Sequence, residues 1–409
     1  MKGKHWASWL LAGLVVVGNA PTVAATTVPQ TPAPPPAIEG AAVPANGTVV
    51  LTRAAARKEL LALPAVGQAS RAEQDAYDNW RNAVARAEQL DTEKMKFENP
   101  WTGKTETIVY NDLTQMRLRQ QKYILPDQLK LAADMASATT TLTILTLENA
   151  LDGQLLGLYA AQEDVASGKR DLTLAEEALV RTKALLAAGR VTQSDVDDAT
   201  LAVRKAQAAL NASQRTLENR IRSYNRFAGA PVGRRISVSP DVSGVLPLLN
   251  ADDYVVQALQ NRMEIRRQRA NIQLLERTLE SLTFRDLHKF DTDITSEYAK
   301  TALDLQKARL ELTETQRAIT AEIRAGMIEL RIAQLDLESM KRSLATQREK
   351  LASMKVQIDA GRLAAWADDA LQSAVASLES GVRTSTISLD NAVRRFRQAA
   401  GTGPSLEGR

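Results

Sequence analysis

Few side chains in this chain could perform catalytic or metal chemistry. It has no cysteine and only two histidines, His5 and His288. Asp291 and Asp293 follow His288 closely, and together they could suggest a metal-binding cluster. Metal sites, however, need ligands that converge on one point, which a polar run does not guarantee. We interpret this run as a solvated turn and predict no metal site.

The acidic pairs also form no catalytic arrangement. Glu176-Glu177 and Asp197-Asp198 fall in stretches with a helical pattern, where such pairs are typical of exposed faces. The chain has neither a glycine-rich phosphate loop nor a G-x-S-x-G element. The sequence therefore predicts that the protein is not an enzyme and binds no cofactor.

Composition favours an elongated helical protein. A chain of 409 residues exceeds a single compact domain, yet aromatic residues make up only 4% of it. That fraction is low for a globular core and ordinary for long helices that bury narrow seams of Leu and Ala. The 52 Lys and Arg residues are nearly balanced by 48 Asp and Glu residues. This mixed surface predicts no nucleic-acid partner.

The chain repeats itself at a distance of 172 residues. Gly189-Arg190-Val191 returns as Gly361-Arg362-Leu363, and apolar residues recur every seven positions around each copy. Before the glycine they are Leu151, Leu158, Val165, Leu172, Leu179 and Leu186, and Ile323, Leu330, Leu337, Leu344, Leu351 and Ile358. After it they are Val203, Leu210, Leu217 and Tyr224, and Val375, Val382, Leu389 and Phe396. This period indicates coiled-coil packing, and the repeat indicates two copies of one long helical hairpin.

Proline spacing leaves room for these hairpins. No proline lies between Pro126 and Pro231, or between Pro247 and Pro404. Because proline costs roughly 3 kcal/mol inside a helix, uninterrupted helices can run through both intervals. We predict an all-α fold of two tandem long antiparallel coiled-coil helical hairpins, with at most short β segments. Leu172 and Leu344 are equivalent in this scheme, so replacing either by alanine should lower the thermal midpoint of unfolding by a similar amount. Replacing Gln162 by alanine should do little.

The N-terminus has the pattern of an export signal. Lys2 and Lys4 precede an apolar stretch, 9–17, and Val23-Ala24-Ala25 is a plausible cleavage site. An uncleaved signal anchor is the alternative. No later stretch has 18 apolar residues, so we expect no transmembrane helix in the mature chain.

The remaining organisation follows from these signals. We expect a signal peptide (1–25), a Pro/Ala/Thr-rich linker (26–48), N-terminal helices with a short hairpin (49–126), a first long hairpin with its tip near 189 (127–230), a connector with helices (231–295), a second long hairpin with its tip near 361 (296–403) and a tail (404–409). Within this scheme 53–98 is helical, a brief β-like run falls in 99–111, Asp127 caps the first long helix, and 284–295 is a polar connector.

The segments at the two turns carry a family resemblance. The first is Gly189-Arg190-Val191-Thr192-Gln193-Ser194-Asp195-Val196, and the second is Gly361-Arg362-Leu363-Ala364-Ala365-Trp366-Ala367-Asp368, with alanine where aspartate is preferred. Doubled, in register and inside heptads, this pattern resembles the TolC-type outer-membrane efflux protein family over most of 127–400.

The resemblance implies a homo-trimer whose six hairpins form a tunnel. It also implies that the hairpin tips meet a periplasmic adaptor, or membrane-fusion protein, of an export pump. Two slots remain for membrane strands, 99–111 and 283–295, and each has thirteen residues. A transmembrane hairpin needs at least about 20 residues. We therefore expect the family's membrane β-barrel to be missing or vestigial, so that membrane association is indirect or uses a vestigial barrel.

The tips are the predicted functional site. A left-handed turn is cheap only for glycine, which fits Gly189 and Gly361. The predicted adaptor-docking residues are Gly189, Arg190, Val191, Asp195, Gly361, Arg362, Leu363 and Trp366. The arginines would set orientation, and the apolar side chains would supply contact area. In the alternative, the glycines only cap helices and Trp366 packs back on its own hairpin.

These expectations combine into a predicted function. The chain would be a TolC-like channel-tunnel component of an envelope efflux or export system, exported to the periplasm or outer membrane. The main alternative is a structural coiled-coil spacer or scaffold of the cell envelope with no transport role. An adaptor is a third alternative, but adaptors need flanking domains rich in Gly and Val strands, which this sequence does not show. A spacer has no reason to place two tips at identical spacing.

Overall fold

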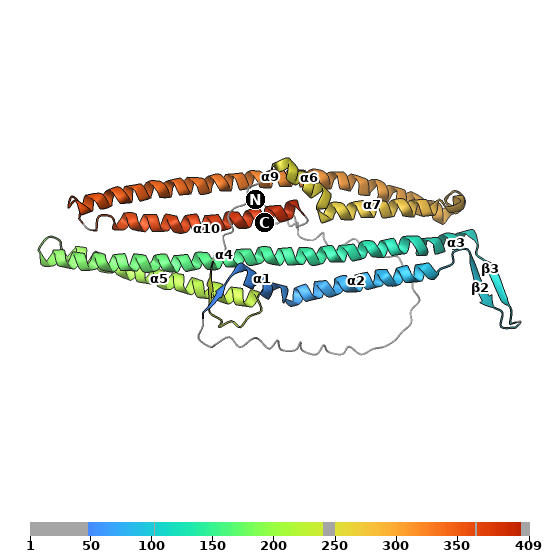
Figure 1. Cartoon of the computed structure of the whole chain (residues 1–409), viewed down its shortest axis with the longest axis horizontal. Helices are drawn as coiled ribbons and strands as arrows, with labels where there is room; N and C mark the ends of the chain where they lie inside the picture. Colours follow the sequence, from blue (N-terminus) through green and yellow to red (C-terminus); the bar gives the residue numbers. More distant parts are fainter. Residues whose placement is uncertain (1–47, 102, 240–249, 365, 402–409) are drawn as a thin grey trace. The chain divides into compact units, whose positions relative to one another are not determined.

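Two helices of 63 and 68 residues dominate the structure: α4 (Leu125–Ala187) and α9 (Thr292–Asp359). At about 1.5 Å per residue each is roughly 95–100 Å long. α5 (Gln193–Phe227) runs back along α4, and α10 (Asp369–Ala400) runs back along α9 (Figure 1). The predicted fold class, all-α with two tandem antiparallel hairpins, is confirmed.

This computed structural model describes residues 48–101, 103–239, 250–364 and 366–401, all of which belong to the unit Thr48–Arg409. The predicted signal peptide (1–25) lies outside the described residues. So do the predicted linker, apart from Thr48, and the predicted tail (404–409).

Shorter elements flank the long helices. In chain order they are β1 (Val49–Leu51), α1 (Arg53–Leu61), α2 (Pro64–Gln89), β2 (Lys94–Glu98), β3 (Thr105–Val109), α3 (Asp112–Arg119), the π-helix η1 (Gln120–Ile124), β4 (Ile236–Val238), α6 (Ala251–Asn261), α7 (Met263–Leu282), the 3₁₀ helix η2 (Phe284–Asp286) and α8 (Leu287–Phe290). α2 lies along the first half of α4, and α6 and α7 lie along the first half of α9.

The long helices stand in a row. Around the glycine turns the order of packed neighbours is α5, α4, α10, α9, and towards the other end it is α2, α4, α7, α9. α4 therefore has neighbours on both sides throughout its length. α9 occupies one edge of the row, and α2 and α5 occupy the other.

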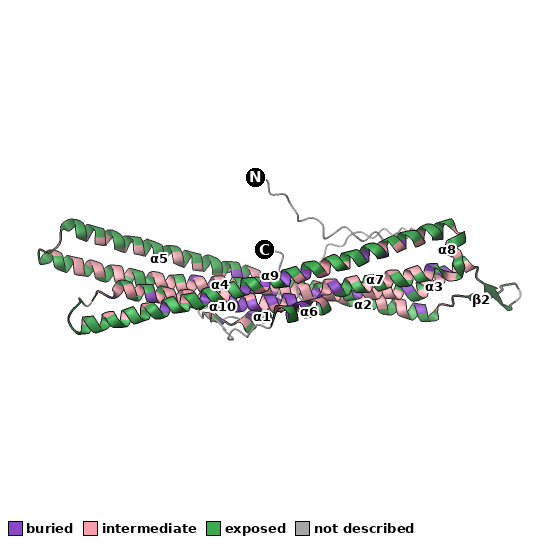
Figure 2. Ribbon diagram, turned by 90° about the horizontal axis from the view of Figure 1, so that it is seen from above, coloured by how far each residue is buried: buried purple, intermediate pink, exposed green. Residues whose placement is uncertain are grey.

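The predicted apolar columns form the seams within each hairpin. Leu151 and Leu158 of α4 pack with Tyr224 of α5 in one core cluster, which also contains β1, α1 and β4 residues. Ile323 and Leu330 of α9 belong to a second cluster, with residues of α6, α7 and α10. Figure 2 shows that buried residues gather midway along the helices, around α1, α6 and α10, whereas the ends are largely exposed. The cores therefore sit where the short helices cover the long ones.

One large cation is fully buried at the join of α6 and α7. Arg262 has an extended backbone that separates the two helices, and its side chain is 1% exposed. Its Nη1 lies 2.8 Å from the Oε2 of buried Glu322 on α9. A buried charge needs such a partner, so this pair fixes the α6–α7 join against α9.

Two short sheets complete the part of the fold that the structure describes. β1 pairs in parallel with β4, and Val49 is the register partner of Ile236. β2 and β3 form an antiparallel ribbon in which Met95 stands opposite Ile108. The prediction that the chain is helical as far as residue 98 was wrong here. Met95 and Phe97 alternate with lysines, a period of two that fits a strand rather than a helix.

The start of α4 also differs from the prediction. The helix does not begin at Asp127, because α3, η1 and α4 follow one another without a break. Pro126 has no N–H to donate, and its ring crowds the preceding turn. The wide π turn before it, in which Leu125 N donates to Gln120 O, accommodates the proline inside the helix.

The polar segment before the second long helix is helical as well. η2 and α8 occupy it, and α9 begins at Thr292, four residues before the predicted start at 296. Asp291 provides the cap, because its Oδ1 accepts from Asp293 N at 3.0 Å and from Ile294 N at 3.1 Å. The acidic run is therefore a helix start.

Candidate functional site

The first tip joins α4 to α5 through a glycine turn. Gly189 has φ +68°, its N–H donates to Leu186 O at 2.9 Å, and Arg190 N donates to Leu185 O at 2.9 Å. This pair of hydrogen bonds closes the last turn of α4 and satisfies two carbonyls that would otherwise be free. The Arg190 side chain is exposed beyond the turn.

The second tip repeats that geometry 172 residues later. Gly361 also has φ +68°, with Gly361 N donating to Ile358 O at 2.9 Å and Arg362 N donating to Gln357 O at 2.9 Å. Arg362 is exposed like its counterpart. The left-handed conformation expected at both glycines is therefore present at both.

The tips differ in how the returning helix begins. Thr192 and Asp195 form a reciprocal capping box at the start of α5. Hydrogen bonds from the Thr192 backbone N–H and hydroxyl hold the pKa of the Asp195 carboxyl below its ordinary value. Asp195, predicted as a docking residue, thus has a structural role in this box. α10 begins at Asp369, and the side chain of the preceding residue, Asp368, makes no capping hydrogen bond to it.

Apolar side chains are more exposed at the second tip. Trp366 is 55% exposed and Leu363 is 37% exposed, whereas Val191 at the first tip is half-buried. Trp366 lies in the loop before the returning helix α10. A large exposed aromatic residue on a turn is the kind of anchor that protein contacts use.

One arginine brings the two tips together. Arg181 lies two turns before the end of α4, and its Nη2 is 2.7 Å from Oδ2 of Asp369 on α10. The same guanidinium lies over the Trp366 ring, 5.3 Å from its centroid. Sequence reasoning missed Arg181, because its ion-pair partner Asp369 lies 188 residues away and nothing local distinguishes it from an exposed arginine. Trp366 therefore bridges the hairpins and also exposes one surface.

Below the tips, polar pairs continue the link between α4 and α10. Ser373 Oγ lies 3.3 Å from Asp171 Oδ1, and Arg383 Nη2 lies 2.7 Å from Glu163 Oε2. Burial alone would raise the pKa of the Glu163 carboxyl. Hydrogen bonds from Arg383 and Ser380 outweigh the burial and lower that pKa. The hairpins are thus apolar within and joined to one another by polar contacts.

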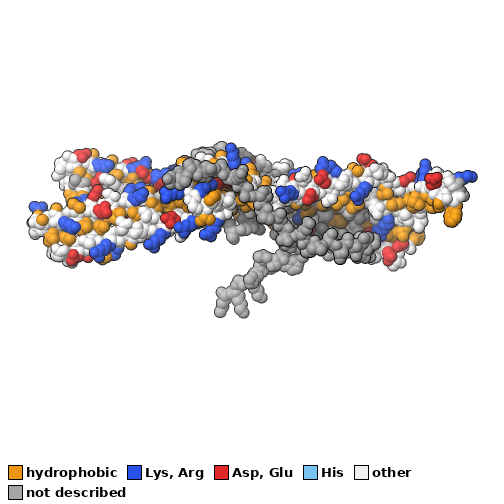
Figure 3. Space-filling model, turned by 90° about the horizontal axis from the view of Figure 1, so that it is seen from below, with side chains coloured by type: hydrophobic (Ala, Val, Ile, Leu, Met, Phe, Trp, Pro, Cys, Tyr) orange, Lys and Arg blue, Asp and Glu red, His pale blue; other side chains and the backbone are white. Residues whose placement is uncertain are grey.

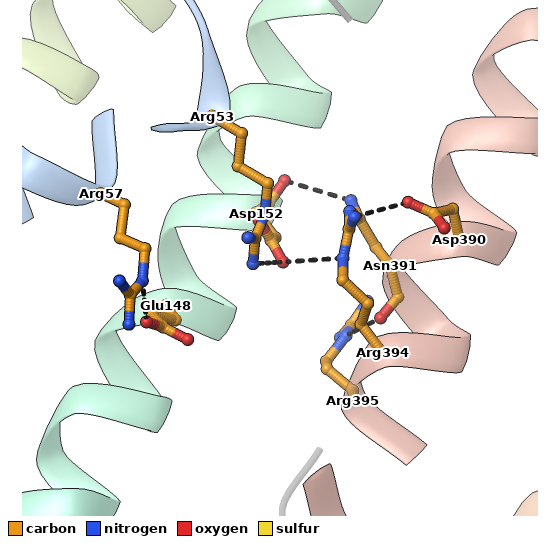
Figure 4. A network of polar contacts seen from close by, with 8 residues as sticks. All are labelled: Arg53, Arg57, Glu148, Asp152, Asp390, Asn391, Arg394 and Arg395. Atoms are coloured by element: carbon orange, nitrogen blue, oxygen red, sulfur yellow. Dashed lines mark hydrogen bonds and ion pairs between the residues drawn. The ribbon is translucent and has the colours of Figure 1, made fainter. Parts of the chain in front are cut away.

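The link ends in a charged network midway along the helices. Figure 4 shows α1, α4 and α10 contributing its side chains, with Asp152 at the centre. Arg53 Nε lies 2.7 Å from Asp152 Oδ1, and Arg394 Nη1 lies 2.7 Å from Asp390 Oδ2. Asp152 is 3% exposed, so its charge depends on Arg53 and on Arg394, whose Nε lies 3.9 Å from Asp152 Oδ2. The network ties the N-terminal helix and both hairpins into one unit.

The residues first considered for metal chemistry do not converge. His288 stacks on Tyr298, with ring centroids 4.9 Å apart, and Asp291 serves as the α9 cap. Across the described ranges, no three His, Cys, Asp or Glu side chains gather as they would around a metal ion. The acidic pairs at 176–177 and 197–198 are exposed.

A cavity of about 860 Å³ lies at the end away from the tips, between α2, the start of α4 and α7. Its charged lining is balanced: Arg119, Lys122 and Arg277 against Glu88, Asp127 and Glu280. Arg277 pairs with Asp127, and Lys122 Nζ donates to Leu90 O at 2.7 Å. Such a lining selects neither a cationic nor an anionic ligand.

Comparison with known proteins shows similarity in fold. No protein family and no curated protein matches the chain by sequence. Among solved structures it is similar to CusC, which forms a transmembrane channel (TM-score 0.58, 12% identity, covering 87% of this chain and 93% of that one). It is also similar to the outer-membrane protein VceC of Vibrio cholerae (0.57, 12%, 86% and 96%) and the outer-membrane channel CmeC of Campylobacter jejuni (0.55, 12%, 87% and 86%).

These comparisons confirm the fold that the TolC-type resemblance implied. At 12% identity the likeness concerns fold, and it extends over nearly the whole of each compared chain. None of the described helices combines the length and apolar character that crossing a bilayer requires.

Proposed function

We propose that this protein is a TolC-like channel-tunnel component of an envelope export system, which docks through its hairpin tips on a periplasmic adaptor. One observation carries the proposal: two tips of the same backbone geometry lie at the same end, linked through Arg181. Each tip presents an exposed arginine, and the second adds Leu363 and Trp366. A repeated pair of cation and apolar surface suits a partner that binds both tips at once.

The tunnel requires several copies of the chain, and an exposed apolar stripe on α9 supports their association. Its outer face carries apolar side chains that are each more than half exposed: Leu303, Leu310, Ile328, Ile332 and Leu335. At 100° per residue they fall within a sector of about 60°. That sector lies opposite Leu330 and Leu337, which face α10. The stripe therefore points in the direction in which the row of helices would continue.

The internal repeat supports a second copy of the chain as the partner that covers the stripe. Ile328 corresponds to Leu156 of α4, and Leu335 corresponds to Glu163, each 172 residues earlier. In α4 this face is covered by the second half of the chain: Leu156 lines a small cavity with Ile387, and Glu163 binds Arg383. The equivalent face of α9 would be covered by α2 and α5 of another copy.

Such contacts are head-to-tail, so they close into a ring or continue without end. We propose a closed homo-trimer, as in the TolC-type scheme. Export to the cell envelope, at the periplasm or outer membrane, belongs to the same proposal and is supported by the N-terminal pattern of basic and apolar residues. The balanced surface charge supports a protein partner rather than a nucleic acid.

The decisive test removes the tip chemistry while retaining the turns. The triple variant Arg190→Ala, Arg362→Ala, Trp366→Ala should lose adaptor pull-down and export, with unchanged helicity by circular dichroism and unchanged oligomer size. A matched triple, Arg266→Ala, Arg269→Ala, Trp101→Ala, changes the same residue types on α7 and at the opposite end. It should bind the adaptor like the wild type.

If the tip variant binds and exports normally, the tips are only turns. The envelope-spacer function would then be preferred. If the tip variant changes oligomer size, loss of binding could not be assigned to docking, and Leu363→Ala, which leaves Arg181 and its partners intact, would replace it as the probe.

A further inference from the structure

Two aromatic side chains of α2 line an open groove beside α4. Tyr77 and Trp80 lie about one turn apart on the same side of the helix, with ring centroids 6.2 Å apart in an edge-to-face arrangement. The groove has a volume of about 500 Å³, within the range of roughly 300–1,000 Å³ for ligand sites. The other side chains that line it are polar: Ser70, Glu73, Gln74 and Arg81.

The neighbouring helix α4 holds the two rings in place. Lys130 Nζ lies 5.0 Å from the centroid of the Tyr77 ring and 4.8 Å from that of the Trp80 ring. Asp134, one turn further along α4, accepts hydrogen bonds from Lys130 Nζ at 2.7 Å and from Tyr77 Oη at 3.0 Å. The rings are therefore positioned before a ligand arrives, which reduces the entropy that binding costs.

The charges around the groove pair with one another. Arg81 binds Asp78 on the same helix, and Lys130 is paired with Asp134 as described. Glu73 adds one carboxylate, which accepts hydrogen bonds and repels anions. Figure 3 shows Lys and Arg side chains interspersed with Asp and Glu along the edge that α5 and α2 form. This groove suits an uncharged ligand with hydroxyl groups better than a cation or an anion.

Neutral polar side chains lie beside the rings. Ser70 and Gln74 lie about two turns and one turn before Tyr77, so they share its side of α2. Neither side chain is hydrogen bonded within the described part of the chain. Sugars combine hydroxyl groups with apolar C–H faces, and these faces stack on aromatic rings because the ring face carries partial negative charge. The groove therefore has the chemistry of a saccharide site.

A protein partner fits this groove less well. Protein contacts depend on a desolvated apolar centre surrounded by further contacts that exclude water. Of the residues that line the groove, Tyr77 and Trp80 alone have large apolar surfaces, and polar side chains border them. The groove would keep such a contact wet.

The groove lies on a face that the proposed assembly leaves open. Asp134 and Asp152 are 18 residues apart on α4, about five helical turns, so they lie on the same side of it. Asp152 binds Arg53 of α1, so this side carries the extra layer that α1, β1 and β4 form. A tube has room for that layer only on its outside, because inside it would fill the passage. The groove would therefore face the surroundings of the tube.

We propose that the groove lined by Tyr77 and Trp80 is a saccharide-binding site, which takes an uncharged glycan strand of the cell wall. The ligand class follows from the rings and the paired charges, and the wall as its source rests on the envelope location proposed above. The two rings stack on the sugar faces, and Ser70, Glu73 and Gln74 bind hydroxyl groups. The site anchors the protein sideways in the wall, a role separate from docking at the tips.

The test is isothermal titration calorimetry of the full chain with chitotetraose, a soluble tetramer of N-acetylglucosamine. The double variant Tyr77→Ala, Trp80→Ala should raise the Kd at least about tenfold, because both stacking contacts are lost. The matched control, Tyr123→Ala with Trp101→Ala, changes the same residue types at exposed positions outside the groove. It should bind like the wild type. Co-sedimentation with isolated peptidoglycan sacculi tests the source, and insoluble starch should retain no protein.

A milder variant keeps the proposal testable if the double variant folds poorly. Ser70→Ala with Gln74→Ala removes hydrogen-bonding groups and retains the rings, and alanine suits a helix. It should weaken chitotetraose binding at least about threefold with an unchanged circular dichroism spectrum. Wild-type affinity of both groove variants would overturn the proposal, as would a wild type that binds neither chitotetraose nor sacculi.

Two further outcomes separate this site from other roles. Displacement of the protein from sacculi by a proline-rich peptide, but not by chitotetraose, would assign the groove to a protein partner and contradict the proposal. The variant that removes Arg190, Arg362 and Trp366 at the tips should bind sacculi like the wild type. Failure of tip docking would thus leave saccharide binding intact, and loss of saccharide binding would leave adaptor pull-down intact.

Discussion

Gly189 and Gly361 share the left-handed φ of +68° although 172 residues separate them. Neither glycine has another atom within 4 Å of the position that a Cβ would occupy. Substitution at these turns therefore tests backbone conformation alone, without steric clash. The sequence could predict this conformation, because a helix-ending glycine is a local signal that needs no knowledge of tertiary contacts.

Gly189→Ala and Gly361→Ala should each destabilise the protein by about 1 kcal/mol, the usual cost of a left-handed conformation for a residue with a Cβ. Gly153 provides the control. It lies inside α4 and also has open space around its Cβ position. Gly153→Ala should stabilise by about 1 kcal/mol, because alanine is the better helix former. Urea unfolding monitored by circular dichroism measures both the expected losses and the expected gain in unfolding free energy. Equal effects of all three substitutions would contradict the argument.

At the level of elements, the seven-residue columns predicted the seams within the hairpins. They could not predict how strongly each position is buried. Leu172 and Leu344 have the same place in the repeat, yet Leu344 is 8% exposed and Leu172 is only half-buried. The heptad period specifies which face turns inward. The burial also depends on helices outside the pair, which the period does not contain.

We therefore expect unequal costs where the repeat alone predicts equal ones. Leu344→Ala should lower the unfolding free energy by about 2–5 kcal/mol, the range for buried leucines, and Leu172→Ala by less. Gln162 is no longer a suitable inert control, because its side chain bonds Ser237 and the backbone of Val238 in β4. Exposed Gln214 on α5 replaces it. Thermal unfolding at matched protein concentrations measures the series. Equal shifts of the unfolding midpoint for both leucine variants would mean that the two copies of the repeat are packed alike.

The polar link between hairpins was beyond sequence reasoning. Its partners are separated by 188, 202 and 220 residues in the pairs Arg181–Asp369, Asp171–Ser373 and Glu163–Arg383. On a helix, a charged residue that contacts another helix has the same local sequence pattern as a charged residue that faces solvent. The π turn at 120–124 was missed for a related reason. Pro126 predicts a break, and only the observed backbone shows that the preceding turn widens instead.

The Glu163–Arg383 pair should make stability depend on pH. The pKa of Glu163 is lowered in the folded protein. Its contribution is therefore fully present above the ordinary glutamate pKa of about 4.3 and is lost as the pH falls through the lower folded value. Because Arg383 is 47% exposed, we expect at most about 1 kcal/mol. Thermal unfolding at pH 7 and pH 3 should show Glu163→Gln destabilising at pH 7 only. Glu338→Gln, in a more exposed pair on α9, is the matched control and should matter less.

At the scale of the whole molecule, the chain forms a row of helices with unlike edges. One edge is α9 with its apolar stripe, and the other is formed by α2 and α5. In the proposed assembly the edges of two copies would meet as the halves of one chain do, with α4 against α10 and α7 as the pattern. The two junctions would differ in chemistry. Exposed Leu335 of α9 stands where the repeat has Glu163 in the internal junction, so a contact between copies would be drier than the one between halves.

This difference gives a prediction for assembly. Ile328→Asp with Leu335→Asp places two charges on the stripe, where association would have to desolvate them. We expect the wild type to sediment as a trimer at micromolar concentration and the double variant to sediment as a monomer with unchanged helicity. Val180→Asp is the control, because Val180 is about as exposed as Ile328 but lies on α4, which has neighbours on both sides. It should remain trimeric. Since the stripe faces away from α10, neither aspartate touches the core of its own chain, and loss of association would not reflect unfolding. A wild-type monomer at all concentrations would exclude the tunnel, and an associated double variant would place the contact between copies on another face.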